Sequence, residues 1–245
     1  MRHNIIRSKL KKGRCLMKDP IISRHVPETH WFRSSSFKRM IKTYSILYIK
    51  PDIGRKGNGI IRVKKRNDSK IEISYKQTTF KCSREDAFRE IKKILNPKKK
   101  YIIQRGIDLS TYHKRPFDVR VVLQKPLKLW RVSLMFAKIA PQKTSIVTNV
   151  AKGAKEMNVI KTFQGVDQPL NQSKVIRDLI DVSYQISQIL GSYYPLKIVG
   201  LDMGIDKKGK VWFIEANTKP DCSDLKNLDR KMYRRYREAK KLMAK

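Results

Sequence analysis

Residues 198–217 read IVGLDMGIDKKGKVWFIEAN and form the most informative element of the sequence. Two runs of strand-forming residues, 198–205 and 210–216, flank the four residues DKKG, which are typical of a hairpin loop. A four-residue loop places Asp202 across from Phe213. The apolar face of the hairpin is then expected to hold five side chains, those of Leu201, Met203, Ile205, Trp212 and Ile214.

The opposite face of this hairpin is polar. It carries Asp202 and Glu215, and also Asn217 if the second strand continues that far. Two carboxylates and an amide oxygen that converge on one face are ligands of the kind that Mg²⁺ takes, usually together with phosphate oxygens. The hairpin therefore predicts a magnesium site. The alternative is an exposed sheet face that carries acids by chance.

A glycine-rich loop is the second informative motif. Residues 50–60 read KPDIGRKGNGI, in which a strand ends in Lys50 and Gly54, Gly57 and Gly59 follow. Glycines let backbone N–H groups approach phosphate oxygens, and a lysine at a strand end supplies positive charge. The P-loop spacing is absent and a strand follows instead of a helix, which excludes the P-loop and Rossmann interpretations. Glycine-rich hairpin loops also occur without ligands.

The remaining pattern predicts a chain of mixed helices and strands. Helices are expected over 9–18, 35–43, from the Ser83–Asp86 capping box to Pro97, over 171–190 with Gly191 as the stop, and within 225–243 with an apolar side and a solvated basic face. Strands are expected over 46–50, 59–63, 71–75, 101–105, 117–123, 130–138 and 145–150. The sequence contains no internal repeat.

The chain is strongly basic. Its 245 residues include 57 Lys and Arg against 21 Asp and Glu, a net charge of +36, while 40% are hydrophobic, enough for a folded core. Such a charge leaves open an acidic polymer or polypeptide as partner, with nucleic acid less favoured, or a basic surface that serves solubility. The three cysteines have no disulfide or zinc spacing, and neither a signal peptide nor a membrane span is present. We expect a cytoplasmic protein without a membrane partner.

Taken in order, these motifs resemble the ATP-grasp superfamily, and within it the endospore coat-associated YheC/YheD group, with the ribosomal-protein glutamate ligases as more distant relatives. The resemblance covers nearly the whole chain. It is carried by KL at 9–10, LMKD at 16–19, PET at 27–29, YIKP at 48–51, YIIQRGIDL at 101–109, FDVR at 117–120, IVTNVAKG at 146–153, GLD at 200–202 and IEANTKP at 214–220.

The resemblance implies an α+β ATP-grasp fold, in which two subdomains with antiparallel sheets clamp the nucleotide. The chain, 1–245, is then expected to form a single ATP-grasp domain. Its parts are a helical lead-in (1–45), a glycine-loop subdomain (46–105), a metal and catalytic subdomain (106–222) and a basic C-terminal helix (223–245). The domain that precedes the ATP-grasp domain in many relatives is expected to be missing.

The resemblance also implies roles for individual residues. Nucleotide contacts are expected from Lys9 and Lys50 at the phosphates, Gly54, Gly57 and Gly59 in a mobile loop above them, Gln104, Arg105, Gly106 and Ile107 around the adenine, and Asp118, Thr148 and Asn149 near the transferred phosphate. Asp202, Glu215 and Asn217 match the magnesium ligands. Arg120 resembles a phosphate-directed partner of Asp118, with an ordinary cross-strand ion pair as the alternative. Lys138 stands where relatives often have arginine, so a single ammonium group replaces a guanidinium that could donate two parallel hydrogen bonds.

The reaction implied by the resemblance is an ATP- and Mg²⁺-dependent ligation of a carboxylate and an amine through an acyl phosphate. The acid and the amine are unidentified, and the net charge favours an acidic substrate. A kinase that phosphorylates a hydroxyl group is one alternative. The other is a non-catalytic nucleotide-binding or coat-associated protein that binds an acidic partner. Spore association is a further implication of the resemblance.

Overall fold

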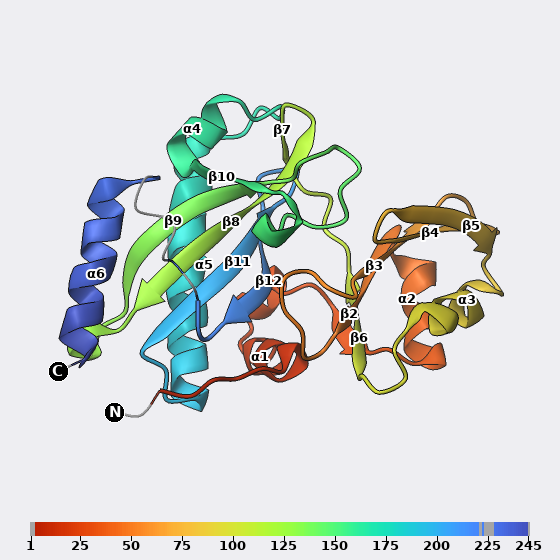
Figure 1. Ribbon diagram of the computed structural model, residues 1–245, viewed down its shortest axis with the longest axis horizontal. Coiled ribbons are helices and arrows are strands. Elements are labelled where there is room, and N and C mark those ends of the chain that lie inside the picture. The colour runs from red at the N-terminus through yellow and green to blue at the C-terminus, as the bar shows by residue number, and fades with distance from the viewer. Residues whose placement is uncertain (1–2, 221, 223–227, 245) are drawn as a thin grey trace.

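The computed structural model describes residues 3–220, 222 and 228–244, and these form two lobes, each built on an antiparallel sheet (Figure 1). The predicted α+β class with two antiparallel sheets is confirmed. Among the residues that the structure describes, none of the helices has the length and hydropathy of a membrane span.

The smaller lobe is a six-stranded sheet covered on one face by two helices. The strand order is β1 (Thr29–Trp31), β6 (Tyr101–Arg105), β2 (Ile46–Pro51), β3 (Ile61–Lys65), β4 (Lys70–Tyr75) and β5 (Thr78–Ser83). Helices α2 (Ser34–Thr43) and α3 (Ala87–Ile94) contribute Phe37 and Ile91 to a core shared with Leu47, Ile49 and Ile73 of the sheet. Alternate strand residues therefore face the helices and leave the other face of the sheet for the space between the lobes.

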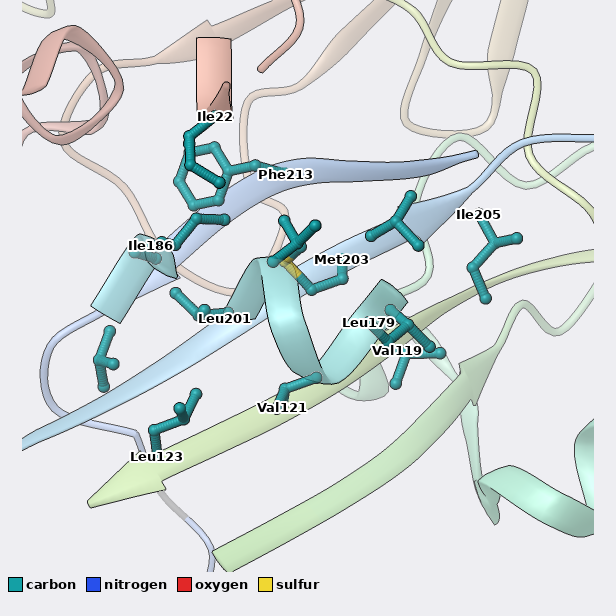
Figure 2. Packing of buried hydrophobic residues seen from close by; sticks show 14 of the residues in the cluster. Ile22, Val119, Val121, Leu123, Leu179, Ile186, Leu201, Met203, Ile205 and Phe213 are labelled. Carbon is teal, nitrogen blue, oxygen red and sulfur yellow. The ribbon is translucent and has the colours of Figure 1, made fainter. Parts of the chain in front are cut away.

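The larger lobe holds the second sheet. Its order is β10 (Lys155–Asn158), β9 (Arg131–Ile139), β8 (Arg115–Gln124), β11 (Ile198–Ile205) and β12 (Val211–Asn217), and the short β7 (Thr111–Tyr112) pairs with β8. Helix α5 (Gln172–Tyr193) covers one face. Figure 2 shows Leu179 and Ile186 of this helix packed among Val121 of β8 and Leu201 and Met203 of β11. Helix α4 (Val159–Gln164) follows β10 and packs against β9 and β10.

Two further helices complete the arrangement. Helix α1 (Lys9–Leu16) contacts β1, β12 and α5, so it joins the two lobes at their base (Figure 1). Helix α6 (Arg230–Ala244) packs on the face of the second sheet opposite α5, where Tyr236 lies in a small core with Val122, Leu134 and Phe136. The predicted amphipathic C-terminal helix is thus present, and residues 223–227 of its predicted start lie outside the described residues.

One predicted strand is absent, and the predicted end of helix α5 is wrong. Residues 145–149 are not a strand; the chain continues into a short 3₁₀ helix, Val150–Lys152, and residues 145–149 line the space between the lobes instead of pairing with a neighbour. Helix α5 does not stop at Gly191 but continues to Tyr193. A Cβ at position 191 would lie 3.2 Å from the Trp130 indole, so this glycine allows close packing and is not a helix cap. Strands β1, β5, β7 and β10 and helix α4 were not predicted.

The predicted register of the β11–β12 hairpin is also wrong. Ile205 pairs with Val211 across a five-residue connection in which Gly209 has φ +83°, and Asp202 pairs with Glu215 instead of Phe213. The ladder skips Ile214, which is the extra residue of a β-bulge. Trp212 and Ile214 therefore lie on the face of Asp202, and their predicted place on the apolar face is corrected: that face holds Val211, Phe213 and Ala216 beside Leu201.

Candidate functional site

A cleft lies between the two sheets and encloses about 840 Å³ of empty space, part of it open to solvent. Its walls come from both lobes: Tyr48, Lys50, Gln104 and Arg105 on one side, and Asp118, Lys138, Asp202 and Glu215 on the other, with residues 145–149 at the rim. A smaller cavity of about 360 Å³ adjoins it, shares Lys50, Gln104 and Glu215, and is also lined by Lys9 and Lys12. Most of the predicted site residues therefore meet in one place.

Four charged side chains form a network on the floor of the cleft. Arg120 Nε donates to Asp202 Oδ1 at 2.6 Å, and its Nη2 donates to Asp202 Oδ2 at 3.1 Å. Lys138 Nζ donates to Asp202 Oδ1 at 2.7 Å and lies 3.0 Å from Asp118 Oδ1. Thr148 Oγ1 donates to the other oxygen of Asp118. Asp118 and Arg120 share a face as predicted, but each pairs with a different partner.

The network is largely buried: the Asp118 and Lys138 side chains are each 6% exposed, and those of Arg120 and Asp202 are 15% and 17% exposed. Burial raises the pKa of Asp118 to about 6 against the opposing charge of Lys138. Burial acts in the same direction on Asp202, but the charges of Arg120 and Lys138 outweigh it and hold the pKa of that carboxyl well below its usual range. Burial would lower the pKa of Lys138, yet Asp118 and Asp202 raise it above the ordinary value. The two carboxylates therefore hold Arg120 and Lys138 in their charged forms.

Lys9 and Lys50 approach the same space from the other side. Lys50 Nζ donates to Gln104 Oε1 at 2.7 Å, and the side chain is buried. Lys9 Nζ lies 3.3 Å from Glu215 Oε1 and donates to the Gly54 carbonyl oxygen at 3.2 Å. Burial lowers the pKa of Lys50 to about 8.

Lys12 is a charged group of the site that sequence reasoning missed. Its Nζ donates to the carbonyl oxygen of Ile6 at 3.1 Å and to that of Ala216. The residue is 3% exposed on the buried side of α1, and burial lowers its pKa to about 8. The available signal was its spacing: Lys12 stands three and four residues before Cys15 and Leu16, on the helix face where a hydrophobic residue is expected.

The glycine loop between β2 and β3 borders the cleft. Gly57 and Gly59 have φ of +68° and +75°, which favours glycine at both positions. A Cβ at position 57 would lie 3.2 Å from Val147 Cγ2, so the loop meets the segment that carries Thr148 and Asn149. The Asn149 side chain accepts a hydrogen bond from Ala151 N and begins the 3₁₀ helix.

The predicted adenine segment connects the lobes. The Arg105 guanidinium lies 5.2 Å from the Tyr44 ring centroid and 4.8 Å from that of Trp212, so the side chain bridges a residue of each lobe. Gly106 N donates to the Ile46 carbonyl oxygen at 2.7 Å, and Ile107 lines the cleft. The Gln104 side chain is engaged by Lys50 and by Thr29.

Of the predicted magnesium ligands, Asp202 and Glu215 line the cleft, whereas Asn217 lies on the same face of the hairpin but is exposed and lines neither of the two cavities. Asp202 and Glu215 are direct neighbours across the ladder, and Gly200 pairs with Asn217. The Asn217 side chain accepts from Lys219 N at 3.0 Å. The described residues contain no group of three or more His, Cys, Asp or Glu placed to bind a metal ion. The carboxylate oxygens suit a hard cation. In this structure, however, Arg120 and Lys138 form ion pairs with Asp202, and Lys9 forms one with Glu215.

Comparison with known proteins gives a consistent result. The family model described as YheC/D like ATP-grasp matches residues 3–244. The chain is 32% identical over 224 residues to the endospore coat-associated protein YheD of Bacillus subtilis (85% of this chain, 47% of YheD), and 23% identical over 211 residues to YheC of the same organism (84% and 57%). It thus spans about half the length of these relatives.

Solved structures support the fold. The D-cycloserine synthetase DcsG superposes with a TM-score of 0.57 at 12% identity, over 96% of this chain and 70% of that one. At this identity the similarity concerns the architecture of the two lobes.

Proposed function

The chain belongs to the YheC/D-like ATP-grasp family, and from this premise we propose that it binds ATP between its two lobes and uses it to join a carboxylate to an amine. The observation that carries the proposal is the largely buried network of Arg120, Lys138, Asp118 and Asp202, which faces Lys50 across the cleft, with Lys9 in the adjoining cavity. Phosphoryl transfer depends on positioning and charge neutralisation, and this arrangement supplies both.

Each side chain has a proposed task. Lys50 of the small lobe and Lys9 of α1 hold the phosphates, while Arg120 and Lys138 neutralise the charge that develops on the transferred phosphoryl group. The glycine loop with Gly54, Gly57 and Gly59 covers the phosphates. Gln104, Arg105, Gly106 and Ile107 border the adenine; Gln104, Arg105 and Ile107 line the cleft, and Ile107 offers an apolar wall.

Asp118, Thr148 and Asn149 line the side of the cleft near the transferred phosphate. Asp202, Glu215 and Asn217 would hold Mg²⁺. The ion, when bound, would draw charge from the phosphate oxygens and fix their orientation. We further propose that residues 1–245 act as one ATP-grasp domain, with the lead-in, glycine-loop part, metal part and basic helix divided at residues 45, 105 and 222.

The proposed reaction has two balanced steps. A carboxylate oxygen of the first substrate bonds to the γ-phosphorus while the bond to the β-phosphate oxygen breaks, which gives an acyl phosphate and ADP. The amine nitrogen then bonds to the acyl carbon. The bond between this carbon and the phosphate oxygen breaks, phosphate leaves with its electron pair, and the nitrogen loses a proton. No side chain of the protein becomes a covalent nucleophile in this scheme.

The net charge of +36 supports an acidic substrate or docking partner, since polyanions are drawn to such a surface. The names of the relatives YheD and YheC support association with the endospore coat.

The test of the proposed function is a substrate screen with ATP and MgCl₂ that measures ADP release and, with hydroxylamine present, acyl hydroxamate. ADP together with hydroxamate is expected. ADP together with a phosphorylated hydroxyl compound would replace the ligase by a kinase. ATP binding without turnover of any acid and amine pair would leave a non-catalytic nucleotide-binding protein.

A further inference from the structure

The cleft is a positive site overall, although it contains three carboxylates. Among the described residues, the charged side chains that line the two cavities or bond to their walls are Lys9, Lys12, Lys50, Arg105, Arg120, Lys138, Asp118, Asp202 and Glu215. Six cations face three anions, an excess of three positive charges. An isolated divalent cation is repelled by such a field, whereas a polyphosphate is attracted.

The oxygens that would bind a metal are already engaged. Arg120 donates one N–H to each oxygen of Asp202, and Lys138 adds a further bond to Oδ1. Glu215 has Lys9 at 3.3 Å. A cation that approaches alone must displace buried, hydrogen-bonded charges, and each displaced cation would be left in a poorly solvated place.

Two lysines, by contrast, form no ion pair with the residues that the structure describes, although the charge of Glu215 acts on both. Within the part of the chain that the structure describes, no carboxylate lies within 4.0 Å of Lys50 Nζ or Lys12 Nζ; Lys50 bonds to the neutral Gln104 and Lys12 to two carbonyl oxygens. Both residues are more than nine-tenths buried. Buried cations without counter-ions are costly, so an anion that enters the cleft recovers part of this cost.

We propose that the cleft binds a triphosphate chain first and without a divalent cation, and that it takes the cation only afterwards, when the phosphates have drawn Arg120 and Lys138 away from Asp202. The ligand class is a linear polyphosphate, either inorganic or part of a nucleotide. The inference rests on the proposed function, because it concerns the same cleft and the same metal ligands.

The test uses the full chain at fixed ionic strength and needs no turnover. Binding of Mn²⁺ alone is measured by electron paramagnetic resonance, and binding of tripolyphosphate, ATP and AMP is measured by calorimetry in EDTA. Tripolyphosphate and ATP are expected to bind in EDTA and AMP weakly. Mn²⁺ is expected to bind at least about tenfold more tightly when tripolyphosphate is present.

Two variants sharpen the test. Arg120→Met removes both guanidinium bonds to Asp202 and leaves only the Lys138 bond to Oδ1, so it should strengthen binding of Mn²⁺ alone by about tenfold or more. Lys207→Met removes the same charge from an exposed pair with Asp108 and should leave Mn²⁺ binding unchanged. Thermal melting of each variant checks that it folds. If Arg120→Met does not fold, the measurements on the wild type still test the inference.

The outcomes are separable. Binding of Mn²⁺ to the wild type with equal affinity with and without tripolyphosphate would overturn the inference and leave the proposed ATP site intact. A requirement for Mn²⁺ before any ATP binds would do the same. If neither ATP nor tripolyphosphate binds in EDTA or in MgCl₂, the proposed function itself fails. If ATP binds in EDTA but tripolyphosphate does not, the adenosine part carries the affinity and the polyphosphate inference is wrong.

Discussion

Asp202 on β11 and Glu215 on β12 are direct neighbours across the hairpin ladder, and they are so because the strand inserts one extra residue, Ile214, beside them. An uninterrupted ladder from the five-residue connection would turn Glu215 to the core face, where Phe213 and Ala216 now lie. The bulge therefore sets the two carboxylates side by side in the cleft.

The first prediction concerns Glu215, which is 30% exposed and lies on the edge strand of its sheet. Glu215→Gln should reduce Mg²⁺-dependent turnover at least about tenfold, because a neutral amide is a weaker ligand for a hard cation. The melting temperature should change little. An unchanged rate and an unchanged Mg²⁺ dependence would remove Glu215 from the metal site.

Asp202→Asn should behave differently, because this carboxylate also neutralises Arg120 and Lys138. Loss of one partner of a buried ion pair costs about 3 kcal/mol. We therefore expect both loss of turnover and a free energy of unfolding that is lower by about this amount in urea titrations. A variant as stable as the wild type would show that the network is solvated and contributes little.

Lys50 and Lys56 provide a matched pair of charges. Lys50 is buried and fixed by Gln104, whereas Lys56 is exposed in the glycine loop. Lys50→Ala should weaken ATP binding about tenfold or more, and Lys56→Ala much less, since a fixed contact outweighs a screened charge. Calorimetry at one ionic strength measures both. Equal losses would mean that general positive charge drives the binding.

Gly106 and Gly13 provide a second matched pair, for the fold. A Cβ at position 106 would lie 2.9 Å from the Ile46 carbonyl oxygen and would also meet the Ile46 side chain, so Gly106→Ala should destabilise by about 1–3 kcal/mol. Gly13 lies within α1 with no atom within 4 Å of such a Cβ, so Gly13→Ala should stabilise by up to about 1 kcal/mol. Thermal melting should move in opposite directions for the two variants. A common direction would contradict the close approach at Gly106.

The sequence indicated the fold and most of the site because the relevant residues stand next to secondary-structure signals. Lys50 ends an apolar run, and Asp202 and Glu215 lie in an alternating hairpin. The hairpin register was predicted wrongly, yet Glu215 and Asn217 lie on the expected face. The connection is one residue longer than expected, and the bulge at Ile214 compensates for this residue at Glu215 and Asn217 but not at Trp212.

Other parts of the site depend on contacts between distant segments, which no local pattern reports. Arg120 bonds to Asp202, which lies 82 positions away in the chain, and Lys12 of α1 bonds to Ala216, which lies 204 positions away. Residues 145–149 have strand-like composition but line a cleft. β-propensity describes how well a segment fits a sheet. It does not report whether a strand is in place to pair with that segment.

The last prediction concerns pH and follows from Lys50 and Lys12, whose pKa values burial lowers to about 8. Between pH 8 and about 10.4 the unfolded chain binds more protons at these positions than the folded chain, so their contribution to stability rises with pH. Affinity for a polyphosphate should change in the opposite direction. Each lysine that must be protonated weakens binding about tenfold per pH unit above 8.

Calorimetric titration of tripolyphosphate in EDTA from pH 7 to 9.5 measures this decline. Lys50→Arg keeps its proton throughout the range, so it should flatten the pH dependence while retaining much of the affinity. Lys56→Arg is the matched control and should follow the wild type, because this side chain is exposed. If the affinities of wild type and Lys50→Arg for tripolyphosphate decline with the same slope, groups other than Lys50 set the pH dependence. Lys50 then does not hold the phosphates.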